Sequence, residues 1–263
     1  MIRACIHDCT PNHSFQFVPA QKGLHRTAFS PLRYVKVAVY AVVNSQEVAV
    51  SHSPNIHFRL LDNARDSLSH AVELLAWKDL GTDHTRLKHA ITNSAHAVEL
   101  LLKERLRLIH PAFIWEKVDK YPSLEAQTVN VSTAIIRLER VGGIELSQSD
   151  KNNLKSLRNT RNAIEHYEWS TSEKEAKLIV GNALSFAFSF ADQELGIDLA
   201  AEFKRDDTWR ALLQELADFV RAHGKRIAEK LQENGEHPEY CEECEEYTVP
   251  CDGVSCELCG HWP

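Results

Sequence analysis

Hydrophobic side chains recur at every third or fourth position along most of the chain that follows Pro54. This spacing puts them on one face of an α-helix, so each stretch is typical of an amphipathic helix with one buried side. The pattern predicts six helices, over residues 55–75, 85–109, 129–141, 149–167, 172–195 and 206–232. Short connections between them favour antiparallel neighbours. The sequence therefore predicts an all-α fold, an antiparallel helical bundle.

Local signals mark several of the predicted helix ends. The second helix should stop before Pro111, because the residue that precedes a proline is pushed out of the helical conformation. The pair Gly142-Gly143 should end the third helix. Ser147 or Ser149 is the expected N-cap of the fourth.

Residues 1–54 follow no helical pattern. They hold four prolines, scattered histidines, Cys5 and Cys9, and one alternating segment, YVKVAVYAVV, that is typical of a strand or hairpin arm. We find no functional motif in them. Three parts are therefore expected: an N-terminal extension of uncertain order at 1–54, a helical domain at 55–232 and a tail at 233–263.

Composition places the chain among globular proteins. Its 263 residues, 43% of them hydrophobic, are enough for a buried core. No apolar run approaches the roughly 20 residues of a membrane span. The first twenty residues lack the basic-then-apolar order of a secretory signal. We expect a cytoplasmic protein with no membrane partner.

The net charge of -7 is unevenly distributed along the chain. Residues 232–263 carry nine acidic residues and no Lys or Arg, which leaves 30 basic and 28 acidic residues elsewhere, about +2. A general nucleic-acid coat would need a pI above about 9, so that class is excluded. RNA contacts confined to one cleft are compatible with this balance.

The stretch LRNTRNAIEHY, which ends the fourth predicted helix, gathers the groups that a metal-free ribonuclease needs. Arg161 is permanently cationic and matches phosphate with a planar fork of donors. His166 can give or take a proton near neutral pH. Asn162 and Arg158 fall on the same polar sector of the helix.

An ordinary structural role competes with this interpretation. Arg161 and Glu165 have the spacing of an intrahelical ion pair, and a histidine at position 166 interacts favourably with the helix C-terminus. The opposite side of the helix should face the bundle through four apolar residues, Leu154, Leu157, Ile164 and Tyr167.

The segment RNAIEH resembles the R-x4-6-H motif of the HEPN superfamily (higher eukaryotes and prokaryotes nucleotide-binding domain). Two long opening helices, the second reading SAHAVELLLKERLR, and a capped helix STSEKEA after the motif extend the resemblance over about residues 55–195. It implies a HEPN-like bundle and a metal-independent endoribonuclease, often a toxin or an antiviral defence effector. His166 would transfer protons, Arg161 would stabilise the phosphate, and Asn162 would orient them. Arg158 would contact the substrate.

Cleavage of RNA by its own 2′-hydroxyl needs a base for that hydroxyl, an acid for the leaving 5′-oxygen and positive charge that stabilises the phosphorane. One chain offers a single motif histidine. A two-fold dimer that joins two copies of the fourth helix supplies two histidines and two arginines. HEPN ribonucleases generally dimerise in this way, so a homodimer through the helix of Arg161 and His166 is expected, with RNA as its substrate and no catalytic metal.

Five of the seven cysteines fall within residues 241–263. Two C-x-x-C pairs among them resemble a zinc ribbon, because each short turn directs two thiolates at one tetrahedral ion: Cys241, Cys244, Cys256 and Cys259. Eleven residues separate the pairs, fewer than usual, so Cys251 or His261 stays open as a substitute ligand. Unpaired or disulfide-linked cysteines are the alternative. Four thiolates leave no open position, which makes the zinc structural.

The acidic surroundings of the cysteines disfavour RNA binding by the tail and favour a protein partner such as an antitoxin. Two other functions stay open: a non-catalytic HEPN-like module that binds RNA, a nucleotide or a protein, with the zinc ribbon as adaptor, and a purely structural interaction module.

Overall fold

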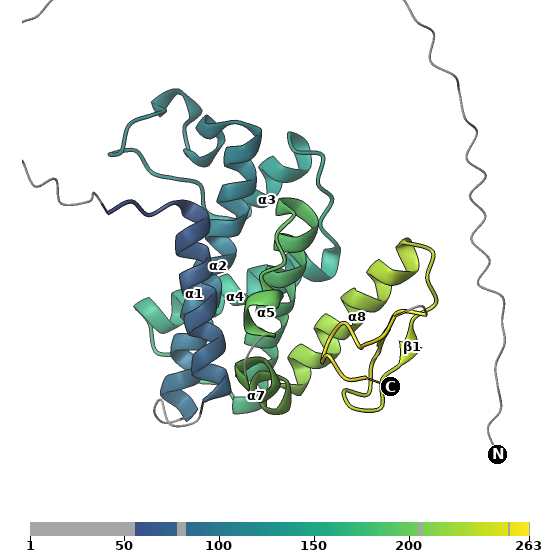
Figure 1. The fold of residues 1–263 in the computed structure, drawn as a ribbon. Coiled ribbons are helices and arrows are strands. Elements are labelled where there is room, and N and C mark those ends of the chain that lie inside the picture. The colour runs from purple at the N-terminus through teal and green to yellow at the C-terminus, as the bar shows by residue number, and fades with distance from the viewer. Residues whose placement is uncertain (1–55, 78–82, 205–206, 252, 263) are drawn as a thin grey trace, which may run out of the picture. The chain divides into compact units, whose positions relative to one another are not determined.

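The computed structural model describes residues 56–77, 83–204, 207–251 and 253–262 (Figure 1). The predicted extension at 1–54, including its alternating segment, lies outside the described residues. Within the described part the protein is mostly helical, which confirms the predicted class, and its one sheet is a two-stranded hairpin near the C-terminus.

Eight α-helices lie within the described residues: α1 (Leu60–Ala76), α2 (Asp83–Ile109), α3 (Val131–Arg140), α4 (Gln148–His166), α5 (Glu173–Leu195), α6 (Ala200–Phe203), α7 (Asp207–Glu215) and α8 (Ala217–Glu233). Two short 3-10 helices, η2 (Pro111–Ile114) and η3 (Val118–Lys120), follow α2. The antiparallel strands are β1 (Glu239–Tyr240) and β2 (Tyr247–Val249). The first five predicted helices correspond to α1 to α5.

The prediction of one continuous sixth helix is wrong, because the chain bends between two helices, α7 and α8. Leu216 leaves the helical conformation, with φ -125° and ψ 72°, and its side chain is fully buried. The bend lets α7 contact α1 while α8 packs against α5 and β2. Neither proline nor glycine marks this position, so the usual sequence signal of a kink is missing.

Capping side chains fix the ends of the helices around the motif. The Oγ atom of Ser147 accepts a hydrogen bond from the Asp150 N–H at 3.0 Å, so Ser147 is the N-cap of α4. Ser172 caps α5 in the same way, by accepting from the Glu175 N–H at 3.1 Å. Gly196 ends α5 in the left-handed conformation, φ 66°, which glycine adopts without strain.

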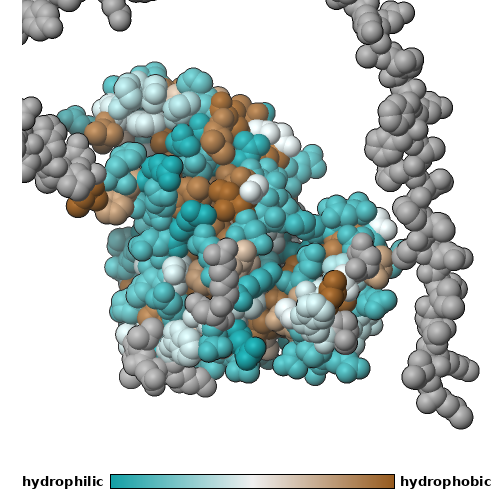
Figure 2. Space-filling view, viewed as in Figure 1, coloured by the Kyte–Doolittle hydropathy of each residue, from teal (hydrophilic) through white to brown (hydrophobic). Residues whose placement is uncertain are grey.

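Helix α2 holds the bundle together, since it contacts α1, α3, α4 and α5. Its buried side chains, such as Ile91, Leu101 and Leu106, are fully excluded from water. On the face drawn in Figure 2, hydrophilic residues cover most of the described surface and hydrophobic patches interrupt it.

Two buried or half-buried arginines anchor backbone segments. Arg86 donates to the carbonyl oxygens of Leu74 and Leu75 at 2.8 and 3.0 Å, which satisfies the last turn of α1. Arg137 of α3 donates to the carbonyl oxygens of Phe113 and Trp115 at 2.7 and 2.5 Å, and so holds the connector that follows α2.

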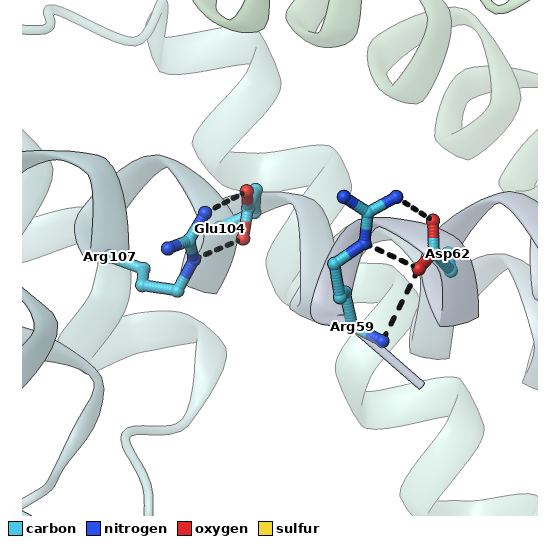
Figure 3. A network of polar contacts seen from close by, with 4 residues as sticks. All are labelled: Arg59, Asp62, Glu104 and Arg107. Carbon is cyan, nitrogen blue, oxygen red and sulfur yellow. Dashed lines mark hydrogen bonds and ion pairs between the residues drawn. The ribbon is translucent and has the colours of Figure 1, made fainter. Parts of the chain in front are cut away.

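Ion pairs lie near the start of α1 and the end of α2 (Figure 3). Arg59 reaches both carboxylate oxygens of Asp62, at 2.8 and 3.1 Å, while its backbone N–H donates to the same group. Glu104 is buried, and Arg107 grips it with two hydrogen bonds of 2.7 Å. The guanidinium thus meets the buried carboxylate with a bidentate, charge-assisted pair of hydrogen bonds.

A polar junction ties the start of α4 to the rest of the bundle. Asp150 is buried and is paired with the Arg226 guanidinium of α8. Arg226 also donates to the Ser185 hydroxyl of α5 at 3.0 Å. Three helices meet at this junction, so the direction of α4, which carries the motif, is set from its first turn.

His223 of α8 is a fully buried histidine in an aromatic cluster. Its ring stacks on Phe219 at 5.2 Å between centroids and lies 6.3 Å from Trp209. Burial, and then the charges of Lys204 and Arg226, lower its pKa to about 3. Among the described residues no hydrogen-bond partner meets its Nδ1 atom. The folded protein therefore holds this histidine neutral.

Acid should weaken the fold through His223. The pKa of His223 in the folded protein lies below the ordinary value of 6.5. Below pH 6.5 the imidazole is therefore protonated in the unfolded chain and stays neutral in the folded one. The free energy of unfolding therefore falls on acidification, by about 1.4 kcal/mol per pH unit, or about 2 kcal/mol between pH 6.5 and pH 5.

Urea denaturation of the wild type and of His223→Phe at both pH values measures this loss. The variant keeps an aromatic ring that can stack but lacks the titratable imidazole. Every other acid-sensitive group is common to the two proteins. The wild type should lose about 2 kcal/mol more than the variant. An equal loss in both would show that His223 does not titrate in this way.

Candidate functional site

Helix α4 presents the motif at its C-terminal end. Leu154 and Leu157 are buried as predicted, and they pack α4 into the core. The helix ends at His166, and the next residue, Tyr167, adopts an extended conformation with φ -139° and ψ 178°. The prediction that Tyr167 faces the bundle is wrong, because its side chain is 77% exposed. The helix has ended before Tyr167, so helical periodicity does not set the direction of this side chain.

Glu165 connects the predicted catalytic residues. Its Oε1 lies 2.9 Å from Arg161 Nε and its Oε2 lies 3.9 Å from His166 Nε2. Arg161 also donates to the Asn162 side-chain oxygen at 3.2 Å. The structure thus brings Arg161, Asn162 and His166 into one chain of contacts at a partly exposed surface. The Arg161–Glu165 contact is also the intrahelical ion pair that an ordinary structural role predicts.

Glu165 was missed as a site residue, although its spacing from Arg161 signals an ion pair. The Glu165 carboxylate lies between the Arg161 guanidinium and the His166 imidazole. Arg161 and His166 lie on different sides of the helix, so their link depends on Glu165 and on the helix ending at His166.

A small hollow of about 40 Å³ lies between α2 and α4, beside Arg161. Arg158 and Arg161 line it together with His96 and Glu99 of α2. The Nδ1 atom of His96 lies 2.9 Å from the hydroxyl oxygen of Ser67, which fixes the ring.

Arg158 lines this hollow. One guanidinium nitrogen donates to the Ser132 hydroxyl of α3. Its buried Nε has no hydrogen-bond partner among the described residues. Two arginines and one unsatisfied donor line this hollow beside the Glu99 carboxylate, and we call it the oxyanion hollow after the group that such donors bind. His96 also lines this hollow, although no pattern in the sequence distinguishes it from the other histidines on helices.

The second candidate site is a cluster of four thiols in the tail. The Sγ atoms of the two predicted C-x-x-C pairs all lie within 4.8 Å of one another. The Cys241 and Cys259 sulfurs are 3.6 Å apart, and those of Cys244 and Cys256 are 3.7 Å apart. A tetrahedral zinc ion with Zn–S bonds of about 2.3 Å places its sulfurs about 3.8 Å apart. The donor set therefore fits a tetrahedral metal such as zinc.

The alternative ligands lie outside this cluster. Cys251 is exposed and does not belong to it. His261 takes part through its backbone, whose N–H donates to Cys259 Sγ at 3.4 Å. The structure therefore favours the four cysteines of the two C-x-x-C pairs over either substitute.

Protonation of the thiols is set by burial and by hydrogen bonds. Burial raises the pKa of Cys244 to about 12 and raises the pKa of Cys259 as well. Burial also acts to raise the pKa of Cys256, but hydrogen bonds from the Cys259 N–H and the Thr248 hydroxyl outweigh it and lower that pKa. A metal at this cluster would displace protons, so its binding should weaken in acid.

The cysteine tail is packed against helices rather than held by itself. Trp209 of α7 donates its indole N–H to the Leu258 carbonyl oxygen at 2.8 Å. Cys241 and Leu258 are buried in the same apolar core as the helices. Gly224 of α8 leaves room for Glu246, whose Cγ would lie 2.9 Å from an added Cβ. The boundary at residue 233 stays a prediction, but the tail and α7–α8 share a core.

No helix in the described ranges is both long and apolar enough to cross a membrane. Comparison with known proteins gives no match: neither a family model, nor a curated protein, nor a solved structure resembles the chain closely enough to be counted.

Proposed function

We propose that this protein is a metal-independent endoribonuclease of HEPN type. The observation that supports it most is the chain of contacts Arg161–Glu165–His166 at the open end of α4. A cation and an imidazole are linked there at a surface that RNA can reach, with His166 63% and Arg161 40% exposed. The hollow with Arg158 adds positive charge beside them.

The chemistry follows from these residues. A histidine takes the proton of the 2′-hydroxyl, the freed oxygen attacks the adjacent phosphorus, and the bond from phosphorus to the 5′-oxygen breaks. A second histidine gives a proton to that leaving oxygen. Arg161 and Arg158 stabilise the charge of the phosphorane, and Asn162 holds Arg161 in place. The products are a 2′,3′-cyclic phosphate and a 5′-hydroxyl.

The second histidine is assigned to a second copy of the chain. A homodimer that joins two α4 helices across a two-fold axis brings His166 of each copy to one cleft. Such a dimer also doubles the arginines around the phosphate. RNA is the substrate, and a cytoplasmic toxin or antiviral defence effector is the setting that the HEPN resemblance suggests.

The tail is assigned a structural zinc ion held by the four clustered cysteines. Zinc bound there would cross-link the two C-x-x-C turns, and with four sulfur ligands it leaves no position for substrate. A hollow of about 720 Å³ lies between the tail and α7–α8, and its charged lining holds both signs: Arg210, Arg221, Glu243, Glu245 and Glu246. We assign the acidic tail beside it to a protein partner, such as an antitoxin.

One observation favours a second function, a non-catalytic module that binds RNA, a nucleotide or a protein. The Arg161–Glu165 pair is an ordinary i, i+4 ion pair, which a helix surface forms without any catalytic role. Under this alternative the motif would serve binding or dimer contacts, and the tail would act as an adaptor.

Cleavage in the absence of divalent metal separates the two functions. Purified protein in EDTA should cut RNA and leave DNA of the same sequence intact, because DNA lacks the attacking 2′-hydroxyl. Gel analysis of labelled single strands measures both, and excess EDTA should leave the initial rate of RNA cleavage unchanged while the tail retains its zinc. A strict requirement for added metal, or cutting of DNA, would contradict the proposed mechanism.

A further inference from the structure

A larger hollow, of about 410 Å³, lies just beyond the motif at the end of α4. Its volume falls within the range of roughly 300–1,000 Å³ that is typical of ligand pockets. Its lining includes His84, Lys88, Tyr167, Trp169 and Ser170, and Glu173 lies beside them. They come from the start of α2, the segment that follows α4, and the start of α5.

The aromatic residues of this hollow differ in how they are held. Trp169 is half-buried and packs against the core, so its ring is fixed. Tyr167 is 77% exposed, and its ring lies 6.4 Å from the His166 ring in an edge-to-face arrangement. A large aromatic ring that is left in water beside the motif contributes little to the apolar core. It is placed to cover a flat ligand that enters the hollow.

Polar groups surround the aromatic rings. Lys88 and His84 are exposed on the α2 side, where a phosphate can meet them. Ser170 is exposed on the opposite side. Single-stranded nucleic acid is bound by this combination, in which bases stack on aromatic faces while cations follow the backbone.

The two hollows lie along the same pair of helices. The oxyanion hollow contacts α2 at 95–99 and α4 at 154–161, and the aromatic hollow contacts α2 at 84–88 and reaches α4 at Ile164. The motif histidine, at position 166, is thus near the aromatic hollow, while Arg161 borders the oxyanion hollow. One strand of RNA lying along α2 and α4 would meet both.

We propose that the aromatic hollow is a subsite for an unpaired RNA base, that of a nucleotide flanking the bond that is cut. This inference rests on the proposed ribonuclease function and specifies its substrate as single-stranded RNA. The base stacks between Tyr167 and Trp169, and Lys88 contacts the adjoining phosphate. A base within a duplex is paired and stacked, so it cannot enter.

Binding of an RNA analogue that cannot be cut tests this subsite. The probe is a fluorescein-labelled single-stranded hexanucleotide with 2′-fluoro sugars, which lacks the attacking hydroxyl, and the readout is fluorescence anisotropy with the full chain. Tyr167→Ala and Trp169→Ala should each weaken binding about 10-fold. Tyr167→Phe keeps the stacking face and should bind as the wild type does. Tyr247→Ala removes an exposed tyrosine of the tail and should have no effect.

Two further arms separate stacking from charge. An abasic oligonucleotide of the same length should bind the wild type and Tyr167→Ala equally, because it offers no base to stack. Lys88→Gln should lower the slope of log affinity against log salt by about 0.7, the contribution of one phosphate contact on a single strand.

The outcomes distinguish the subsite from the ribonuclease function. If the wild type cuts RNA and Tyr167→Ala binds the hexanucleotide as tightly as the wild type, the subsite is overturned while the ribonuclease stands. If binding depends on Tyr167 and on the bases but RNA stays intact, the subsite stands and the ribonuclease falls. Thermal melting shows whether Trp169→Ala stays folded, because Trp169 is half-buried. If that variant unfolds, the binding measured with Tyr167→Ala tests the subsite by itself.

Discussion

Replacing His166 or Arg161 by alanine is expected to reduce RNA cleavage at least about 100-fold, because the two residues supply proton transfer and phosphate stabilisation. Initial rates on a labelled RNA measure the loss. Both side chains are substantially exposed, so the fold and the dimer should survive, as circular dichroism and analytical ultracentrifugation can show. Any growth toxicity of the wild type should disappear with either variant.

Matched controls isolate the motif from general changes of charge. His237→Ala removes an exposed histidine in the tail, and Arg140→Ala removes an exposed arginine at the end of α3. Both should cut RNA at the wild-type rate. Full activity of purified His166→Ala or Arg161→Ala would end the catalytic assignment.

Cys241→Ser is expected to release the zinc ion and to unfold the tail. Metal binding and folding are almost one event in so small a module, where structural zinc is worth about 10–16 kcal/mol in isolated peptides. The tail packs most directly on α7 and α8, so these helices should lose stability with it, while α1 to α5 keep the contacts that they make with one another. Elemental analysis measures the metal, and hydrogen exchange locates the loss of protection.

Cys251→Ser is the matched control, because Cys251 is exposed and lies outside the thiol cluster. It should retain one zinc ion per chain. The absence of zinc from wild-type protein purified under reducing conditions would refute the ribbon, and equal loss of zinc from both variants would refute the choice of ligands. Loss of protection throughout α1 to α5 in Cys241→Ser would show that the tail supports the entire bundle.

The helices were predictable because each carries its own amphipathic stripe and local caps. Ser147 caps α4, and the Gly142-Gly143 pair, with Gly143 at φ 67°, follows the end of α3, by chemistry that acts within a few residues. The four clustered cysteines were predictable for the same reason, since each C-x-x-C turn sets two ligands locally. The HEPN relationship and the catalytic roles stay predictions.

Features that depend on contacts between distant segments were not predictable. Nothing in the sequence signals the bend at Leu216, which follows from packing α7 and α8 on different helices. Arg137 bonds to backbone carbonyls more than twenty residues away in sequence, a contact that no pattern encodes. The exposed Tyr167 side chain and the packing of Trp209 on the tail belong to the same class.

Identification of the ends of the RNA fragments tests the central claim most directly. Purified wild-type protein is incubated with a single-stranded RNA in EDTA, and the fragments are analysed by mass spectrometry. Attack by the 2′-hydroxyl predicts a 2′,3′-cyclic phosphate on the upstream fragment and a 5′-hydroxyl on the downstream one, and neither product with His166→Ala. Fragments with 3′-hydroxyl and 5′-phosphate ends, or RNA left intact by the wild type, would contradict it.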